Sequence, residues 1–213
     1  MDNFSRKYFE LLTNEYAGIN LTRINEFNEF RDKQIVDSIK PYEISEIFNG
    51  LINKCGLVVD IGFGGGFPIL PLAKLIPSVN FVGVETRNKK VKVVSEIANK
   101  LSLKNVKLVH SRLENFYFDV DCVCTLKAVG KVNDFLSRFS TDKEINVFFY
   151  KGPNFYDIEK EEIAKTKNDW EIIEEKEIEV PGTEKRFLIG FKNKNVLRRT
   201  NDIKNLVKLS SIL

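Results

Sequence analysis

The chain has 213 residues, of which 43% are hydrophobic and 30% are charged, with a formal net charge of +3, which describes one globular domain with a sizeable core. No stretch has the ~20 consecutive apolar residues of a membrane span, and the first residues lack the apolar core of a signal peptide, so we expect a cytoplasmic protein that does not bind membranes. Three cysteines without CxxC spacing and a single histidine argue against a zinc site, and we expect no metal.

The first part of the chain is expected to form a helical cap. Apolar residues recur at helical spacing over 3–17, and Gly18 then ends the helix before a polar loop. A second, weaker helix is expected over 26–38, closed by Pro41, and a third over 43–53. The expected divisions of the chain are this cap over 1–54, a main domain over 55–192 and a basic tail over 193–213, all within one structural domain.

From residue 57 onward, apolar runs of strand length alternate with helical patterns, which indicates a doubly wound parallel sheet. The expected strands are 57–61, 80–84, 106–109, 120–125 and 145–150, with helices beginning near 67–70 and covering 87–103 and 131–139. Two last strands, 170–180 and 186–192, predict an antiparallel hairpin at one edge. The expected fold class is therefore α/β, a Rossmann-like methyltransferase fold with a mostly parallel seven-stranded sheet, a C-terminal antiparallel hairpin and an N-terminal helical cap. The tail is expected to be exposed, and helical if ordered.

The motif Asp60-Ile-Gly-Phe-Gly-Gly-Gly-Phe-Pro68 ends a buried strand in an acid and then a glycine-rich turn. Glycines suit this turn because a Cβ disfavours its backbone angles and because a ligand must approach the main chain closely. Phe67 stands where a dinucleotide-binding loop has its third glycine, which favours S-adenosylmethionine over a nicotinamide or flavin cofactor. A glycine turn without a ligand is the alternative. The residues expected to hold the cofactor are Asp60, Gly62, Gly64, Gly66 and, at the end of the next strand, Glu85, which would accept hydrogen bonds from both ribose hydroxyls.

Absent motifs narrow the choice of methyl acceptor. Enzymes that methylate an exocyclic amine commonly carry an Asp/Asn-Pro-Pro-aromatic motif after the fourth strand, where this chain has Thr125-Leu126-Lys127-Ala128. Methylation of a pyrimidine carbon needs a cysteine nucleophile on a loop, whereas Cys122 and Cys124 fall within an expected strand. Guanine N7 needs neither device, because its lone pair attacks a sulfonium methyl directly. Catalysis would then be alignment, without a dedicated base.

Several motifs of the chain occur together in one family. They are Asn20-Leu21-Thr22 with Asp37-Ser38 downstream, Asp60 to Pro68, Pro71-Leu72-Ala73, Lys89-Lys90-Val91, Ser111-Arg112-Leu113-Glu114, Lys127-Ala128-Val129, Lys151-Gly152, and Val180-Pro181-Gly182 with Arg186. Over residues 8–191 the chain resembles the bacterial glucose-inhibited division protein B family, which methylates N7 of a guanine in 16S ribosomal RNA. The positions that depart from the family pattern are Gln34 and Phe187 for histidine, Ile69 for glycine and Lys127 for arginine.

The resemblance implies roles for individual residues. Gly62 and Phe67 would line the cofactor loop, and Leu113 and Glu114 would border the adenine. Lys127 would reach both cofactor and base, and we expect it to be the catalytic residue that positions them. The implied partner is 16S ribosomal RNA or the small ribosomal subunit, and we expect a monomer.

Basic residues are unevenly distributed, which suits a polyanionic partner. Eight lysines and arginines lie in 87–112 against one acid, whereas 157–179 holds ten acids against four lysines. Solvated helix faces are the alternative explanation. The candidate RNA contacts around the site are Arg23, Arg112, Lys151 and Arg186.

Two other functions stay open on the sequence. One is methylation of another RNA or of a small molecule. The other is a catalytically silent RNA-binding or ribosome-assembly factor built on the same fold, which would bind RNA without incorporating a methyl group.

Overall fold

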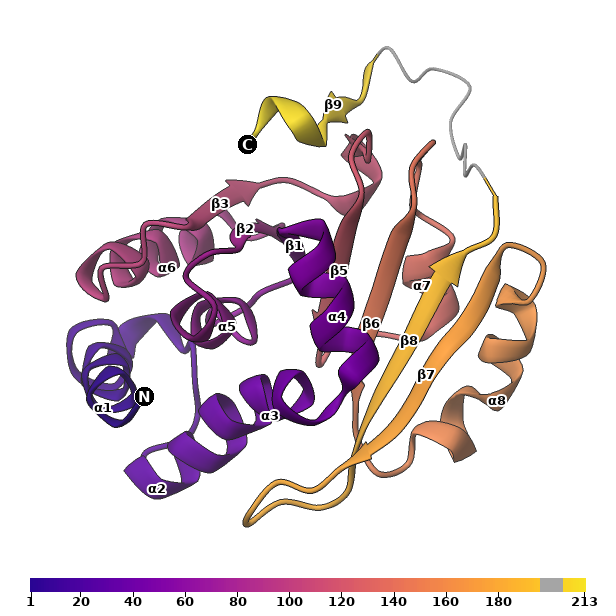
Figure 1. Ribbon diagram of the computed structural model, residues 1–213. Helices are drawn as coiled ribbons and strands as arrows, with labels where there is room; N and C mark the ends of the chain where they lie inside the picture. Colours follow the sequence, from indigo (N-terminus) through magenta and orange to yellow (C-terminus); the bar gives the residue numbers. More distant parts are fainter. Residues whose placement is uncertain (196–204) are drawn as a thin grey trace.

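The computed structural model describes residues 1–195 and 205–213, and within them seven strands form one sheet in the order β3-β2-β1-β5-β6-β8-β7 (Figure 1). The parallel strands are β1 (Leu57–Ile61), β2 (Asn80–Glu85), β3 (Val106–His110), β5 (Cys122–Lys127) and β6 (Ile145–Lys151). At the β6 edge, the antiparallel hairpin consists of β7 (Trp170–Ile178) and β8 (Arg186–Asn193). The predicted α/β fold, with a mostly parallel sheet and a terminal hairpin, is confirmed.

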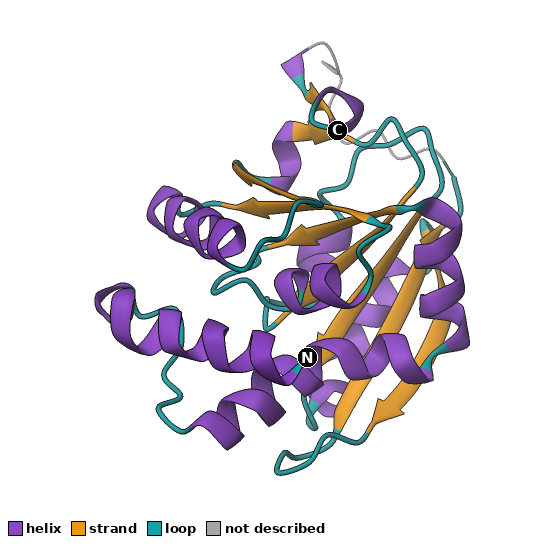
Figure 2. Cartoon of the chain, turned by 60° about the vertical axis from the view of Figure 1, so that its left-hand side comes forward, coloured by secondary structure: helices purple, strands orange, loops and turns teal. Residues whose placement is uncertain are grey.

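Helices cover both faces of the sheet, so its inner strands β1 and β6 are buried along their whole length (Figure 2). One face carries α1 (Asp2–Glu10), α2 (Phe27–Phe30), α3 (Asp37–Ile44), α4 (Glu46–Cys55), α5 (Ile69–Leu75) and α6 (Asn88–Lys100). The other carries α7 (Val132–Leu136) and α8 (Phe155–Thr166). No helix in the described ranges is long and apolar enough to cross a bilayer.

The cap helices differ from expectation in where they end. The first runs through α1 and a π-helical turn, η1 (Leu11–Glu15), to a short 3-10 turn, η2 (Ala17–Ile19). The second expected helix is one continuous helical stretch that ends at Ile44. It consists of α2, a π-helical segment η3 (Arg31–Val36) and α3.

Pro41 therefore does not close the second helix, because it lies inside α3 and is buried. The chain leaves the helix at Ser45, which has extended backbone angles and whose hydroxyl accepts a hydrogen bond from Phe48 N–H at 3.0 Å. Ser45 caps α4, so the third helix begins at Glu46, later than expected. The boundary between α3 and α4 therefore falls at Ser45 and not at the proline.

We expected the tail to be helical if ordered, but its described part, residues 205–213, is not an α-helix. β9 (Val207–Lys208) pairs in parallel with β4 (Phe116–Tyr117), a short strand that the sequence did not predict. The next residues form a 3-10 turn in which Leu209 is fully buried, and Ser210 donates from its amide and hydroxyl to Asp119 at 2.9 and 2.6 Å. An exposed helix is excluded here because Leu209 fills a position in the core of the α7/α8 face. The part of this expectation that concerns 196–204 lies outside the described residues.

Candidate cofactor and acceptor site

The glycines of the turn after β1, which we expected to act together in holding a cofactor, have different roles. Gly62, Gly64 and Gly66 have φ angles of +75°, +57° and +95°, which side chains rarely adopt. A Cβ on Gly66 would collide with the hydroxyl of Tyr8, on α1. Gly66 thus allows the cap to pack on the turn, whereas Gly62 and Gly64 line a cavity at the carboxyl ends of the strands.

Asp60 lies beneath this turn and is fully buried. Its Oδ1 accepts a hydrogen bond from the hydroxyl of Thr125, on β5, at 2.8 Å. Burial raises the pKa of Asp60 to about 7, while the bond from Thr125 opposes the shift. Asp60 therefore connects β1 to β5 beneath the glycine turn. It supports the turn and does not line the cavity.

Glu85 ends β2 and is placed where the sequence predicted an acid. Its Oε2 accepts from Gly64 N–H at 3.2 Å, and its Oε1 accepts from Arg87 N–H at 3.0 Å and from the Thr86 hydroxyl at 3.1 Å. The side chain is largely buried yet lines the same cavity as the glycine turn. This carboxylate thus holds the turn and the start of α6 together at the edge of the cavity.

Two adjoining cavities at the strand ends form one groove. The larger, of about 480 Å³, is lined by Gly62, Gly64, Phe67, Glu85 and Lys127 among others. The smaller, of about 180 Å³, is lined by Leu113 and Glu114 and shares Gly62 with the larger. The structure therefore brings together in one groove all the residues expected to hold a cofactor, except Asp60 and Gly66, which lie beneath or behind its wall.

A third cavity, of about 400 Å³, opens beside the groove and shares Gln34, Lys127 and Ala128 with it. We call it the acceptor cavity. Lys127 ends β5 at this junction, and Ala128, the next residue, has a φ of +54°. Such an angle is uncommon for a residue with a Cβ, and strained backbone of this kind is found most often at functional sites.

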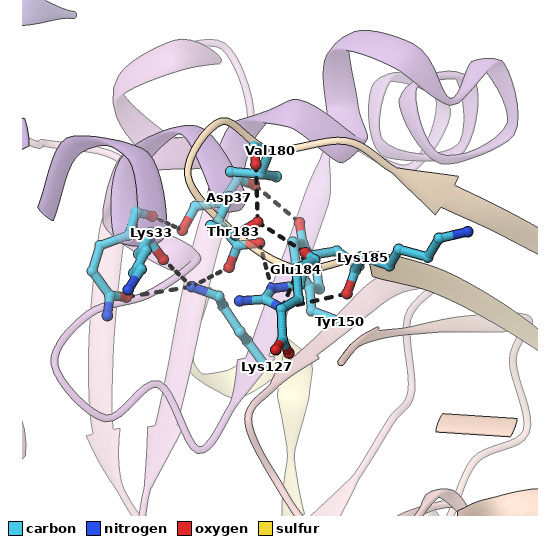
Figure 3. A network of polar contacts seen from close by, with 11 residues as sticks. Lys33, Asp37, Lys127, Tyr150, Val180, Thr183, Glu184 and Lys185 are labelled. Carbon is cyan, nitrogen blue, oxygen red and sulfur yellow. Dashed lines mark hydrogen bonds and ion pairs between the residues drawn. The ribbon is translucent and has the colours of Figure 1, made fainter. Parts of the chain in front are cut away.

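A buried ion network lines the acceptor cavity (Figure 3). Lys127 Nζ lies 2.8 Å from Oδ2 of Asp37, on α3, and donates through longer bonds to Gln34 Oε1 at 3.3 Å and to Lys33 O at 3.4 Å. Arg186 Nε, at the start of β8, lies 3.5 Å from the other Asp37 oxygen. The Tyr150 hydroxyl donates to a backbone carbonyl of α3, that of Ser38, at 3.1 Å. The network joins the cap to β5, β6 and the hairpin.

The sequence predicted Lys127 in the site, whereas Asp37 appeared only in the motif Asp37-Ser38 and had no predicted role there. The two residues are far apart in the chain, and no spacing rule connects them. A charged residue among the buried positions of a cap helix is the signal that could have pointed to Asp37. Ala128 appeared only within the motif Lys127-Ala128-Val129, and nothing in the sequence indicated its positive φ.

The comparisons with known proteins fit this geometry. The family model for GidB, described as rRNA small subunit methyltransferase G, matches residues 2–189. The chain belongs to the GidB family. The ribosomal RNA small subunit methyltransferase G of Lactobacillus helveticus is 32% identical over 193 residues, which cover 85% of this chain and 78% of that protein.

Another curated relative of the same name, from Clostridium perfringens strain 13, is 39% identical over 108 residues, or 51% of this chain. The match spans less than half of that relative, 43% of its length. Among solved structures, a SAM-dependent methyltransferase from Aquifex aeolicus superposes with a TM-score of 0.50 at 17% identity, covering 72% of this chain and 92% of that one. The predicted family and the methyltransferase fold are confirmed.

The cations expected to contact RNA lie in different environments in this GidB-family chain. Arg23 is exposed in the loop after η2, and the Arg112 side chain is 69% exposed beside Glu114. Arg186 is partly buried in the ion network described above.

Lys151 lines the acceptor cavity but is buried and paired within the protein, and is not the exposed rim cation that was expected. Its side chain is only 8% exposed, and Nζ lies 2.7 Å from Glu159 Oε1, on α8, and 2.8 Å from Gly130 O. The apolar surroundings at the end of β6 bury the lysine stem, so its charge needs an internal partner, which Glu159 supplies. No group of three metal-ligating side chains occurs anywhere in 1–195 or 205–213.

Proposed function

We propose that this chain transfers a methyl group from S-adenosylmethionine to N7 of a guanine in 16S ribosomal RNA. The observation that carries the proposal is that the groove and the acceptor cavity lie next to each other and share Lys127 in their linings. A donor in the groove and a base in the cavity would meet at this junction. The names of the curated GidB relatives support ribosomal RNA as the substrate class. A ribosomal substrate also implies a cytoplasmic location, and a monomer stays our prediction.

The groove fits the cofactor. Glu85 offers a carboxylate to two ribose hydroxyls, and Gly62 and Gly64 leave the main chain open to a ligand. Leu113 and Glu114 line the adjoining smaller cavity, which suits the adenine. When bound, the cofactor supplies an electrophilic methyl group on a sulfonium.

The acceptor cavity offers alignment and no nucleophile. Cys122 and Cys124 are fully buried in β5, so neither is available for covalent catalysis. Lys127 is held by the Asp37 carboxylate and can act as a donor and a positive charge. Guanine N7 requires no proton removal before attack, so residues that orient the base and exclude water are sufficient.

A substitution of Glu85, the carboxylate at the end of β2, tests the proposal. Glu85→Ala removes the acceptor for the ribose, and we expect cofactor affinity to fall by about 10- to 100-fold, because hydrogen bonds to charged groups contribute about 1.5–3 kcal/mol. Calorimetry with S-adenosylmethionine and with its demethylated product measures the affinity. The matched control is Glu161→Ala, the same change at an exposed residue of α8.

Methyl transfer is followed with labelled cofactor on small subunits, free ribosomal RNA and metabolites, and the modified position is mapped by reverse transcription. We expect label at one guanine N7 of 16S RNA with the wild-type chain, and about 10- to 100-fold less with Glu85→Ala when the cofactor concentration is below its Kd. Label on another RNA or a metabolite replaces the proposed acceptor. RNA binding without cofactor binding or label leaves the silent assembly factor as the function.

A further inference from the structure

Asp37 is a buried acceptor that its protein partners do not saturate. It begins α3, its side chain is 8% exposed, and it lines the acceptor cavity. One oxygen is held by Lys127 at 2.8 Å, but the other lies 3.5 Å from Arg186 Nε, longer than the usual N–H···O distance of about 2.9 Å. A carboxylate has about four lone-pair sites, so Asp37 can accept further hydrogen bonds from a molecule in the cavity.

Donor and acceptor follow one another along the path from the groove. Lys127 lines both the groove and the acceptor cavity, whereas Asp37 lines the acceptor cavity but not the groove. A ligand that enters the cavity and reaches toward the groove therefore meets the carboxylate of Asp37 and, next to it, the ammonium of Lys127.

Guanine presents its polar atoms in the complementary order. Along its edge, the acceptor N7 is followed by the acceptor O6, then by the N1–H donor and the 2-amino donor. With N7 at the junction, O6 falls at an ammonium and N1–H with the 2-amino group at a carboxylate. We infer that Asp37 determines specificity for guanine by accepting from N1–H and the 2-amino group, while Lys127 donates to O6 in exchange for one of its two long bonds, to Gln34 Oε1 at 3.3 Å or to Lys33 O at 3.4 Å; this inference rests on the proposed function.

Adenine mismatches both positions. It places an amino group where guanine has O6, so the Lys127 ammonium meets a donor, and an unprotonated N1 where guanine has N1–H, so the Asp37 carboxylate meets an acceptor. A site that hydrogen-bonds one base leaves its own buried groups unpaired with the other, which gives strong discrimination.

The test changes the base as well as the protein, because Asp37 also holds the cap in place. Inosine is guanosine without the 2-amino group. With an RNA substrate carrying guanosine or inosine at the modified position, we expect the wild-type kcat/KM to be about 10-fold or more higher for guanosine. Asp37→Asn should lower the guanosine value and bring the guanosine-to-inosine ratio to about 1–2, because the amide keeps only one, neutral, acceptor oxygen and places an NH2 donor where the second carboxylate oxygen accepted.

The matched control on the same helix is Glu43→Gln, an exposed acid of α3 paired with Lys40, which should keep the wild-type ratio. If the role of Asp37 is purely structural, Asp37→Asn lowers kcat/KM equally for the guanosine and inosine substrates. The ratio then stays at the wild-type value, which overturns the inference. Equal use of guanosine and inosine by the wild-type chain overturns it as well.

A binding measurement separates this inference from the proposed function. We would titrate GMP, IMP and AMP into the full chain, saturated with the demethylated cofactor where that binds, and follow the signals of the acceptor cavity by NMR. The expected order of affinity is GMP, IMP, then AMP, with the GMP preference lost in Asp37→Asn. These affinities can be measured even if no methyl transfer occurs. If Asp37→Asn does not fold, the order of the three wild-type affinities is the test. An equal affinity for the three nucleotides contradicts the inference.

Discussion

Asp60 shows how one residue connects the fold to the pH dependence of stability. The native pKa of this buried carboxyl is about 7, well above its ordinary value of 3.8. Between these two values the native state binds more protons than the unfolded state. The free energy of unfolding therefore falls as the pH rises through this window, at up to about 1.4 kcal/mol per pH unit for a single group.

Asp60→Asn should remove this dependence, because an asparagine oxygen still accepts from the Thr125 hydroxyl and carries no charge. We expect the variant to gain stability relative to the wild-type chain as the pH rises from 5 to about 7, and the gain to level off above. Urea unfolding at pH 5, 6, 7 and 8 measures the difference. Parallel stability curves for the two proteins would show that Asp60 is already ionised in the native state.

Among the elements, the end of β6 is tied to α8 by a buried pair. Lys151 Nζ binds Glu159 Oε1 at 2.7 Å, and the second Glu159 oxygen accepts from Val132 N–H, also at 2.7 Å. Both side chains are less than a tenth exposed. The pair therefore joins β6, α8 and the start of α7 across the wall of the acceptor cavity.

Lys151→Met should leave Glu159 buried without its cation and cost about 3–5 kcal/mol of unfolding free energy. Adding Glu159→Gln should recover a large part of this loss, because the glutamine is neutral and keeps an acceptor for Val132. The control is Lys165→Met, an exposed lysine of α8 paired with Glu162, for which we expect a change of at most about 0.5 kcal/mol. Thermal and urea unfolding measure all four proteins. A cost for Lys151→Met as small as that of Lys165→Met contradicts the assignment.

For the whole molecule, the separation of basic and acidic surfaces predicts how RNA binding responds to salt. Arg112 is exposed after β3, and its contact with Glu114, at 3.7 Å, is a weak surface pair. If Arg112 contacts a phosphate, Arg112→Ala should reduce the slope of log Kd against log salt by about 0.7–0.9. Lys165→Ala, on the acidic side of the molecule, should leave the slope unchanged. Filter binding to 16S RNA between low and moderate salt gives both slopes, and equal slopes for the two variants exclude Arg112 from the interface.

The sequence predicted the sheet well because each inner strand is a short apolar run flanked by turn signals. It also predicted Glu85 and the glycine turn, since these lie next to strand ends whose positions fix the site. It misjudged Pro41 because the proline is buried inside α3 and the helix continues past it, so that the chain leaves the helix only at Ser45. It also took Lys151 for a surface cation, because burial of a lysine depends on an acid that packing brings to it. The Asp37–Lys127 pair belongs to the same class of long-range contact.

Docking of Leu209 has a consequence for synthesis on the ribosome. Residues 207–210 leave the ribosomal tunnel after β8, the last strand of the main sheet to be made, and only then can β9 pair with β4. A nascent chain that has already formed the sheet still exposes to water or chaperones the apolar site that Leu209 fills. Completion of this core face therefore waits for residues that are made after the strands of the main sheet.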